Sequence, residues 1–150
     1  MPAHDEYEAS PWKWVRDQVE SYEGSGGREG NTLLDTGMPI IVVTTRGNKT
    51  GKLRKTPLMR VEHDGDYALV GSMGGAPKNP VWVYNLRAAP DAVELQDGDA
   101  PFAVDVRELP EGDEREAWWT RAVAAYPPYA EYQEKTTRRI PVFIATRRNG

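Results

Sequence analysis

A β-branched run, Ile40 to Thr45, constrains the fold of this chain more than any other feature. A short unbroken run of such residues is typical of a buried strand. A turn bounded by glycines follows at residues 46–51, and residues 53–62 have the pattern of a returning strand. A tight turn at 63–66 leads to a third expected strand, 67–71. Together the three strands predict an antiparallel meander.

Pro57 lies inside the second of these strands, where proline disfavours a regular central ladder. Further strands are expected at 93–96, 102–108 and 141–146, with helices at 10–22, 80–88, 113–126 and 129–135. Six strands with inserted helices predict an α+β domain containing a small, mostly antiparallel barrel. Regular βαβ alternation and a GxGxxG turn are both missing from the sequence, which argues against a Rossmann fold.

Signals for helix starts occur at Ser10-Pro11, Asn79-Pro80 and Asp113. The first helix has one apolar stripe, formed by Trp12, Val15, Val19 and Tyr22. This stripe favours packing on the domain, with a lid or a membrane-surface element as the alternatives. The glycine-rich segment 24–30 predicts a flexible linker, so the chain divides into a helix with its linker, 1–30, and a barrel domain, 31–150.

Composition excludes several classes of site. The chain has no cysteine, which excludes disulfides, thiolate metal sites and a cysteine nucleophile, and agrees with a reducing compartment. Its two histidines, His4 and His63, make a histidine-rich metal site unfavourable, and no metal is expected. An acidic, polar N-terminus without a secretory signal and the lack of any membrane-length apolar run predict a cytoplasmic protein.

Positive charge is concentrated in one segment. Residues 46–61 contain six cations and no acid, so this segment carries +6 and the rest of the chain −10 of the net −4. A local cationic patch on an acidic protein favours one specific anionic ligand over nucleic acid or another polyanion. The alternative is a hairpin made basic for solubility. The six cations are Arg46, Lys49, Lys52, Arg54, Lys55 and Arg60.

Three groups of residues are candidates for a ligand-binding or catalytic site. The basic hairpin offers charged donors to phosphate or carboxylate, although it lacks Walker A spacing. The loop Ser72 to Gly75 offers a hydroxyl and backbone amides, but no GxSxG elbow surrounds Ser72. Aromatic rings could enclose a planar ligand or simply pack in the core. These rings belong to Trp82, Tyr84, Tyr126, Tyr129 and Tyr132.

Three separated motifs occur in order: TTRGNKTGKLRKTPL, GSMGGAPKNPVWVYNLRAAP and AYPPYAEYQEKTTRRIPVFI. From about Gly37 to Arg147 the chain resembles the deazaflavin-dependent nitroreductase family of actinobacteria. The resemblance implies a split β-barrel like that of FMN-binding proteins. It also implies coenzyme F-420, a deazaflavin with a phosphate and an anionic oligoglutamate tail, as the ligand of the basic hairpin.

The resemblance also implies roles for individual residues. Tyr129, Tyr132 and Ser72 become candidates for supplying the proton. The acceptor would contact Met59, Ser72, Trp82, Tyr126, Tyr129 and Tyr132. The coenzyme would contact Asn48, Lys49, Thr50, Arg54, Lys55, Thr56, Pro57, Leu58, Met59, Gly71, Ser72, Met73, Gly74, Val81, Trp82, Val83, Tyr84, Asn85 and Tyr129. Met59 and Met73 replace a tyrosine and a lysine of the nitroreductase, which argues against nitroimidazole activation.

The predicted function is therefore hydride transfer from reduced coenzyme F-420 to a small quinone-like or nitro-aromatic acceptor. An FMN-dependent oxidoreductase on the same fold is one alternative, although FMN needs fewer cations than the hairpin supplies. A non-catalytic coenzyme-binding protein is another, and a nucleic-acid-binding barrel is disfavoured by the net acidity. The sequence is also compatible with a homodimer and with peripheral contact with a membrane.

Overall fold

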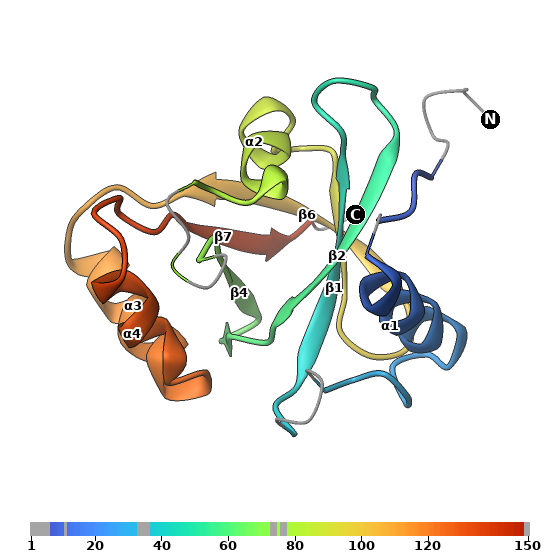
Figure 1. The fold of residues 1–150 in the computed structure, drawn as a ribbon, viewed down its shortest axis with the longest axis horizontal. Coiled ribbons are helices and arrows are strands. Elements are labelled where there is room, and N and C mark those ends of the chain that lie inside the picture. Colours follow the sequence, from blue (N-terminus) through green and yellow to red (C-terminus); the bar gives the residue numbers. More distant parts are fainter. Residues whose placement is uncertain (1–6, 11, 33–36, 73–74, 76–77, 149–150) are drawn as a thin grey trace.

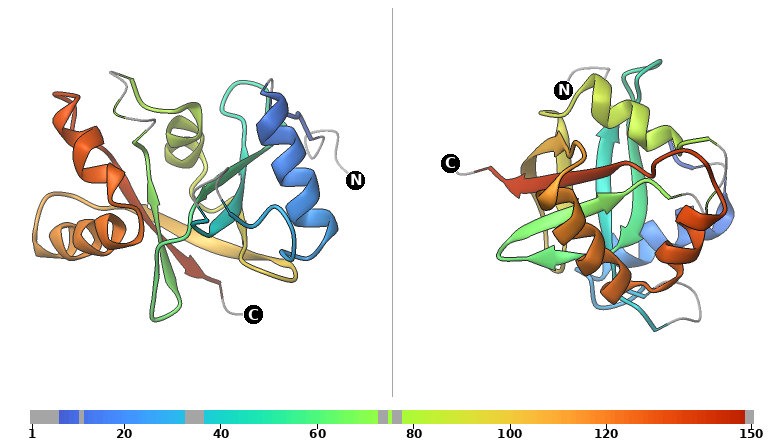
Figure 2. Two further views of the ribbon diagram at one scale, coloured as in Figure 1. Left: turned by 60° about the horizontal axis from the view of Figure 1, so that its bottom comes forward. Right: turned by 90° about the vertical axis from the view of Figure 1, so that its left-hand side faces the viewer.

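The computed structural model describes residues 7–10, 12–32, 37–72, 75 and 78–148. Within them one antiparallel sheet has the strand order β2-β1-β5-β6-β7-β4-β3 and curls so that its two ends approach each other (Figures 1 and 2). The strands are β1 (Ile40–Arg46), β2 (Leu53–Met59), β3 (Glu62–His63), β4 (Asp66–Val70), β5 (Val93–Gln96), β6 (Pro101–Glu108) and β7 (Val142–Arg147). The helices are α1 (Lys13–Gly24), α2 (Val81–Ala88), α3 (Asp113–Ala125) and α4 (Pro128–Glu134).

The α+β class and the antiparallel sheet are confirmed, but the described sheet has seven strands, not six. The expected strand 53–62 divides in two. Its ladder with β1 ends where Met59 faces Ile40. The backbone N–H of Arg60 then donates to the carbonyl of Pro39, and Glu62 and His63 pair with β4 instead.

Both turns of the predicted meander are confirmed, because β1 pairs with β2 and the turn at 63–66 joins β3 to β4, but its middle strand is wrong as one continuous strand between the other two. β1 and β2 pair as expected, but β4 lies between β7 and β3, at the other end of the sheet from β2. Pro57 gives a physical reason for the place of β2, because a residue without an N–H is tolerated on an outer strand. The curl of the sheet brings β2 and β4 near each other without a shared ladder.

The alternation of β1 explains why the domain has two cores. Ile40 and Val42 pack into one hydrophobic cluster, together with buried side chains of α1, α3 and α4. Ile41 and Val43 point to the opposite face, into a second cluster that includes α2. Because successive side chains of a strand face opposite sides, a continuous apolar run is buried on both.

The N-caps of three helices lie one or two residues from their sequence signals. α1 begins at Lys13 with Trp12 at its N-cap, while the Ser10 hydroxyl accepts a hydrogen bond from the Trp12 N–H at 3.2 Å. Pro11 lies outside the described residues. Pro80, not Asn79, is the N-cap of α2, and the Asn79 side chain accepts a hydrogen bond from Arg138 instead. Gly112 is the N-cap of α3, so Asp113 lies in its first turn.

The N-terminal helix packs on the domain, as its apolar stripe predicts. Val19 and Tyr22 are buried in the first cluster, and the Tyr22 hydroxyl accepts a hydrogen bond from the Gly98 N–H at 2.7 Å. A side chain at Gly27 would meet the backbone of Gly98 at 2.8 Å, and one at Gly26 would meet Asp99 at 3.6 Å, so these two glycines lie against the β5–β6 turn. The flexibility of this linker and the division at residue 30 stay predictions. Within the described residues no helix is long and apolar enough to cross a membrane.

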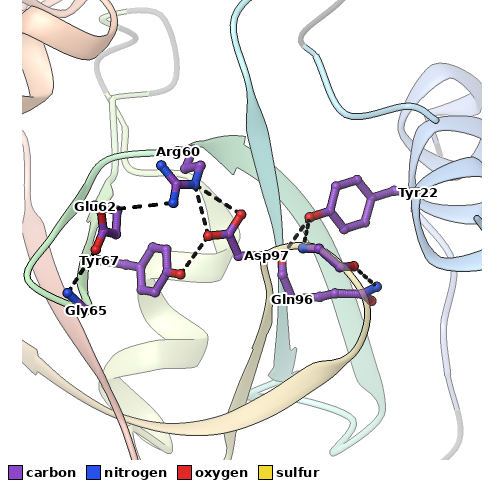
Figure 3. A network of polar contacts seen from close by, with 8 residues as sticks. Tyr22, Arg60, Glu62, Gly65, Tyr67, Gln96 and Asp97 are labelled. Carbon is purple, nitrogen blue, oxygen red and sulfur yellow. Dashed lines mark hydrogen bonds and ion pairs between the residues drawn. The ribbon is translucent and has the colours of Figure 1, made fainter. Parts of the chain in front are cut away.

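A polar network joins the β2–β3 connection, β4 and the β5–β6 turn (Figure 3). The carboxylate of Asp97 accepts hydrogen bonds from the Arg60 guanidinium at 2.9 and 3.0 Å and from the Tyr67 hydroxyl at 2.6 Å. Burial, with the hydrogen bond to Asp97, raises the pKa of Tyr67 to about 12. The hydrogen bond that Tyr67 donates to Asp97 therefore stabilises the fold fully below the ordinary tyrosine pKa near 10. This stabilisation is lost as the pH rises through 12.

Asp97→Ala is expected to lower the free energy of unfolding by about 2–3 kcal/mol, because it leaves the Arg60 charge and the buried Tyr67 hydroxyl without this acceptor. Asp99→Ala is the control, since Asp99 lies exposed in the same turn. Urea unfolding of both variants measures the difference. Equal losses would mean that the turn, not the Asp97 network, carries the stability.

Candidate active site

The curl of the sheet brings β2 and β4 near each other from its opposite ends, and an apolar pocket of about 490 Å³ opens there. Its walls come from β2, the residues after β4, the start of α2, the tyrosines around α4 and the start of α1. The lining residues are Trp12, Trp14, Val15, Thr56, Pro57, Leu58, Met59, Val70, Ser72, Pro80, Trp82, Tyr126, Tyr129 and Tyr132. The curled sheet thus brings together residues that are far apart in the sequence.

The three tyrosines form one cluster in this pocket. Proline at 127 and 128 ends α3 and starts α4, so that Tyr129 and Tyr132 turn back towards Tyr126. The Tyr126 and Tyr129 rings meet edge to face with their centroids 4.9 Å apart. The hydroxyl oxygens of Tyr126 and Tyr132 are 3.0 Å apart and share a hydrogen bond.

Both tyrosines among the candidate proton donors keep their protons at neutral pH. Burial raises the pKa of Tyr129. The hydrogen bond to Tyr126, assisted by burial, raises the pKa of Tyr132 to about 12. A phenol in this state donates a hydrogen bond to an acceptor oxygen, and it releases its proton only to a group that has itself become strongly basic.

The pH profile of turnover tests this state of the tyrosines. Because the pKa of Tyr132 is raised to about 12, kcat should have no basic limb from this phenol between about pH 6 and 9. Tyr132→Phe is then expected to lower kcat by a similar factor across that range. A basic limb that Tyr132→Phe removes would contradict the raised pKa.

A second pocket of about 350 Å³ is lined by the basic hairpin and α2 and is called the polar pocket for its three charged side chains, Glu8, Lys49 and Arg54. The hairpin is held against α2 by Asn85, which is buried. Its side-chain oxygen accepts a hydrogen bond from the Asn48 N–H at 2.9 Å, and its amide donates to Thr45 at 3.3 Å. The lining residues are Glu8, Gly47, Asn48, Lys49, Thr50, Arg54, Val81, Tyr84 and Asn85.

The two pockets share β2 and α2 as walls. Arg54 lines the polar pocket, and Thr56, two residues further along β2, lines the apolar one. Along α2, Val81 lines the polar pocket and Trp82 the apolar one. A ligand with a planar ring and an anionic extension therefore matches the arrangement.

The structure places most of the predicted site residues in one of the two pockets. Of the others, Lys55 pairs with Glu23, while Val83 is fully buried in the second cluster and touches Gly71. Met73 and Gly74 lie outside the described residues. Their roles, like those of the whole set, stay predictions.

The N-terminal segment contributes to both pockets, which the sequence does not predict. Trp12, Trp14 and Val15 line the apolar pocket. Glu8 pairs with Arg54 at 3.2 Å, and Glu23 with Lys55 at 2.6 Å. The available signal was charge complementarity between an acidic N-terminus and a basic hairpin, which does not by itself specify pairs.

The curled antiparallel sheet and the two adjoining pockets indicate a general class of protein, one whose site suits a planar coenzyme with an anionic extension. A solved FAD-binding protein from Mesorhizobium loti, 11% identical with a TM-score of 0.51 over 73% of this chain and 79% of that one, has the same fold. Residues 14–147 match the F420H(2)-dependent quinone reductase family. The chain therefore belongs to this family of oxidoreductases that depend on coenzyme F-420.

Individual relatives and solved structures support the same family. The F420H(2)-dependent quinone reductase Rv1261c of Mycobacterium tuberculosis is 35% identical over 129 residues, 85% of each chain. A solved F420-H2 dependent reductase, FDR-A, is 58% identical, with a TM-score of 0.66 over 71% of this chain and 93% of that one. A structure described as a domain-swapped dimer is 54% identical, with a TM-score of 0.68 over 91% and 99% of the two chains. These findings confirm the predicted family, coenzyme and enzyme class.

Proposed function

We propose that this protein transfers hydride from reduced coenzyme F-420 to a quinone-type acceptor bound in the apolar pocket. The observation that carries the proposal is the pair of pockets sharing β2 and α2 as walls, one apolar and aromatic, the other lined by two cations, Lys49 and Arg54, beside Glu8. When bound, the deazaflavin supplies a hydride, because a carbon replaces the central nitrogen of a flavin.

The protein contributes binding, orientation and a proton. Lys49 and Arg54 would hold the anionic part of the coenzyme through charge-assisted hydrogen bonds. Pro57, Leu58 and Met59 would flank the ring, since they line the apolar pocket along β2. The hydrophobic lining would exclude water from the reacting atoms.

The hydroxyls of Tyr129, Tyr132 and Ser72 would face the acceptor from the opposite walls. All three residues line the apolar pocket. A quinone that receives hydride gains negative charge on oxygen, and a phenol donating a hydrogen bond stabilises that charge. Tyr126 supports this role, because its hydroxyl shares a hydrogen bond with that of Tyr132.

The test is oxidation of reduced coenzyme F-420 by the purified protein with a simple benzoquinone, a naphthoquinone and a nitro-aromatic compound. We expect turnover with quinones and little with the nitro compound, because Met59 lies in the pocket wall where the similar nitroreductase has a tyrosine. Reduced FMN in place of F-420 is the control. Turnover with reduced FMN but not with reduced F-420 would indicate an FMN-dependent oxidoreductase. Binding of F-420 without any turnover would indicate a non-catalytic coenzyme-binding protein.

Assembly and location are part of the proposal. The 54% identical domain-swapped structure supports a homodimer, which sedimentation of the purified chain tests. The cysteine-free sequence supports a cytoplasmic location. Exposed Trp12 and Trp14 at the mouth of the apolar pocket leave peripheral contact with a membrane open.

A further inference from the structure

The side chain of Arg138 joins the two ends of the loop between β4 and α2. It lies half-buried in the segment between α4 and β7. One guanidinium nitrogen donates to the carbonyl of Gly71 at 3.1 Å and to the side chain of Asn79 at 2.8 Å. The other donates to the carbonyl of Ser72 at 2.7 Å. A single planar group therefore fixes both the start and the end of this loop.

The same segment is fixed to the tyrosine helix. Gln133 of α4 donates to the carbonyl of Arg138 at 2.8 Å and accepts from the Ile140 N–H at 3.0 Å. The middle of the loop also touches α4, because a side chain at Gly75 would lie 2.6 Å from the carbonyl oxygen of Tyr132. Loop and helix are thus connected through Arg138 on one side and by direct backbone contact on the other.

The two connected elements, the loop and α4, both contribute residues to the apolar pocket. Ser72 lines it from the loop, and Tyr129 and Tyr132 line it from α4. Burial lowers the pKa of Arg138, so placing the cation here costs solvation free energy. The guanidinium nevertheless contacts main-chain carbonyls of the loop, and these contacts set where the Ser72 backbone lies.

We propose that Arg138 is a positioning residue for the reaction: it fixes the Gly71–Ser72 backbone relative to α4 and so sets the separation of Ser72 from Tyr129 and Tyr132. This inference rests on the proposed function of the apolar pocket. Small misplacements of reacting groups lower rates steeply, so loss of the guanidinium should reduce kcat by about 10- to 100-fold. Coenzyme affinity should change by less than about 3-fold, because only its expected contacts at Gly71 and Ser72 would shift, while Lys49 and Arg54, which would hold its anionic part, lie on other elements.

Arg138→Gln tests the proposal, with Arg139→Gln as the matched control. Arg139 is the next residue, exposed, and paired with Glu111 at the surface. For both variants we would measure thermal melting, the Kd for oxidised F-420 from its fluorescence, and kcat and KM for a quinone. The expected result is a loss of kcat at nearly constant Kd in Arg138→Gln alone. Arg138→Lys should recover part of kcat, because one ammonium replaces only part of the planar fork.

An unchanged kcat in a folded Arg138→Gln protein would overturn the proposal. A loss of kcat and coenzyme affinity in parallel with a lower melting temperature would also overturn it, because it would indicate a general structural role. If Arg138→Gln does not fold, Asn79→Ala removes one acceptor and should lower kcat by a few-fold at constant Kd; a normal kcat there would count against the inference. If the wild type oxidises no reduced F-420, the proposed function fails, and the spectrum of bound coenzyme in Arg138→Gln against Arg139→Gln still tests the position of the loop.

Discussion

Replacing Lys49 and Arg54 together by alanine is expected to weaken binding of coenzyme F-420 by about 100-fold. Both side chains line the polar pocket, where the anionic part of the coenzyme would lie. Each charge-assisted hydrogen bond is worth about 1.5–3 kcal/mol, and partial exposure of both groups reduces the sum towards the lower end. Titration of oxidised coenzyme, followed by its fluorescence, measures the change.

The double variant Lys13→Ala, Arg107→Ala is the control. It removes the same amount of charge, but these residues pair with Asp17 and Glu114 and line neither pocket. Glu8→Gln should act in the opposite direction and tighten binding by a few-fold, because Glu8 competes with an anionic ligand for Arg54. Equal weakening in the two double variants would mean that overall charge, not a site, attracts the coenzyme.

Gly75→Ala should have the largest structural effect, with a loss of about 3 kcal/mol in stability and a parallel loss of turnover. The backbone there has φ +80°, and an added side chain would meet the carbonyl oxygen of Tyr132 at 2.6 Å. The left-handed conformation costs about 1–2 kcal/mol, and displacement of packed backbone adds to it. The contact involves Tyr132, so the tyrosine cluster should shift as well.

Gly65→Ala separates these two causes. Its φ is +87°, but open space surrounds the position where a side chain would be added. It should cost only about 1–2 kcal/mol and leave kcat unchanged. Urea unfolding and quinone turnover of both variants give the comparison. Equal effects would show that backbone strain alone, and not the contact of the loop with α4, determines the outcome.

Elements encoded by adjacent residues could be predicted from the sequence. The β1–β2 hairpin follows from a β-branched run and a glycine-bounded turn, and the restart of a helix at α4 follows from two prolines. The position of β4 could not be predicted in this way. Its partner β7 lies at the other end of the sequence, and the choice among antiparallel neighbours depends on the curl of the whole sheet.

The same distinction, between residues that are adjacent in the sequence and residues that are distant, holds for the candidate site. The hairpin cations and the tyrosines could be identified because each group lies within one short motif. The part played by Arg138 could not, because its acceptors at residues 71, 72 and 79 are main-chain and amide groups about sixty residues away. Trp14 was missed because it falls outside the apolar stripe that packs α1 on the domain.

The most direct measurement is titration of the purified protein with oxidised coenzyme F-420 and, separately, with FMN, at low and high salt. We predict tight binding of F-420 that weakens as salt rises, because Lys49, which is exposed, and Arg54, which is partly exposed, would contact an anionic ligand, and much weaker binding of FMN. Preference for FMN, or F-420 binding that salt and the Lys49→Ala, Arg54→Ala variant leave unchanged, would contradict it.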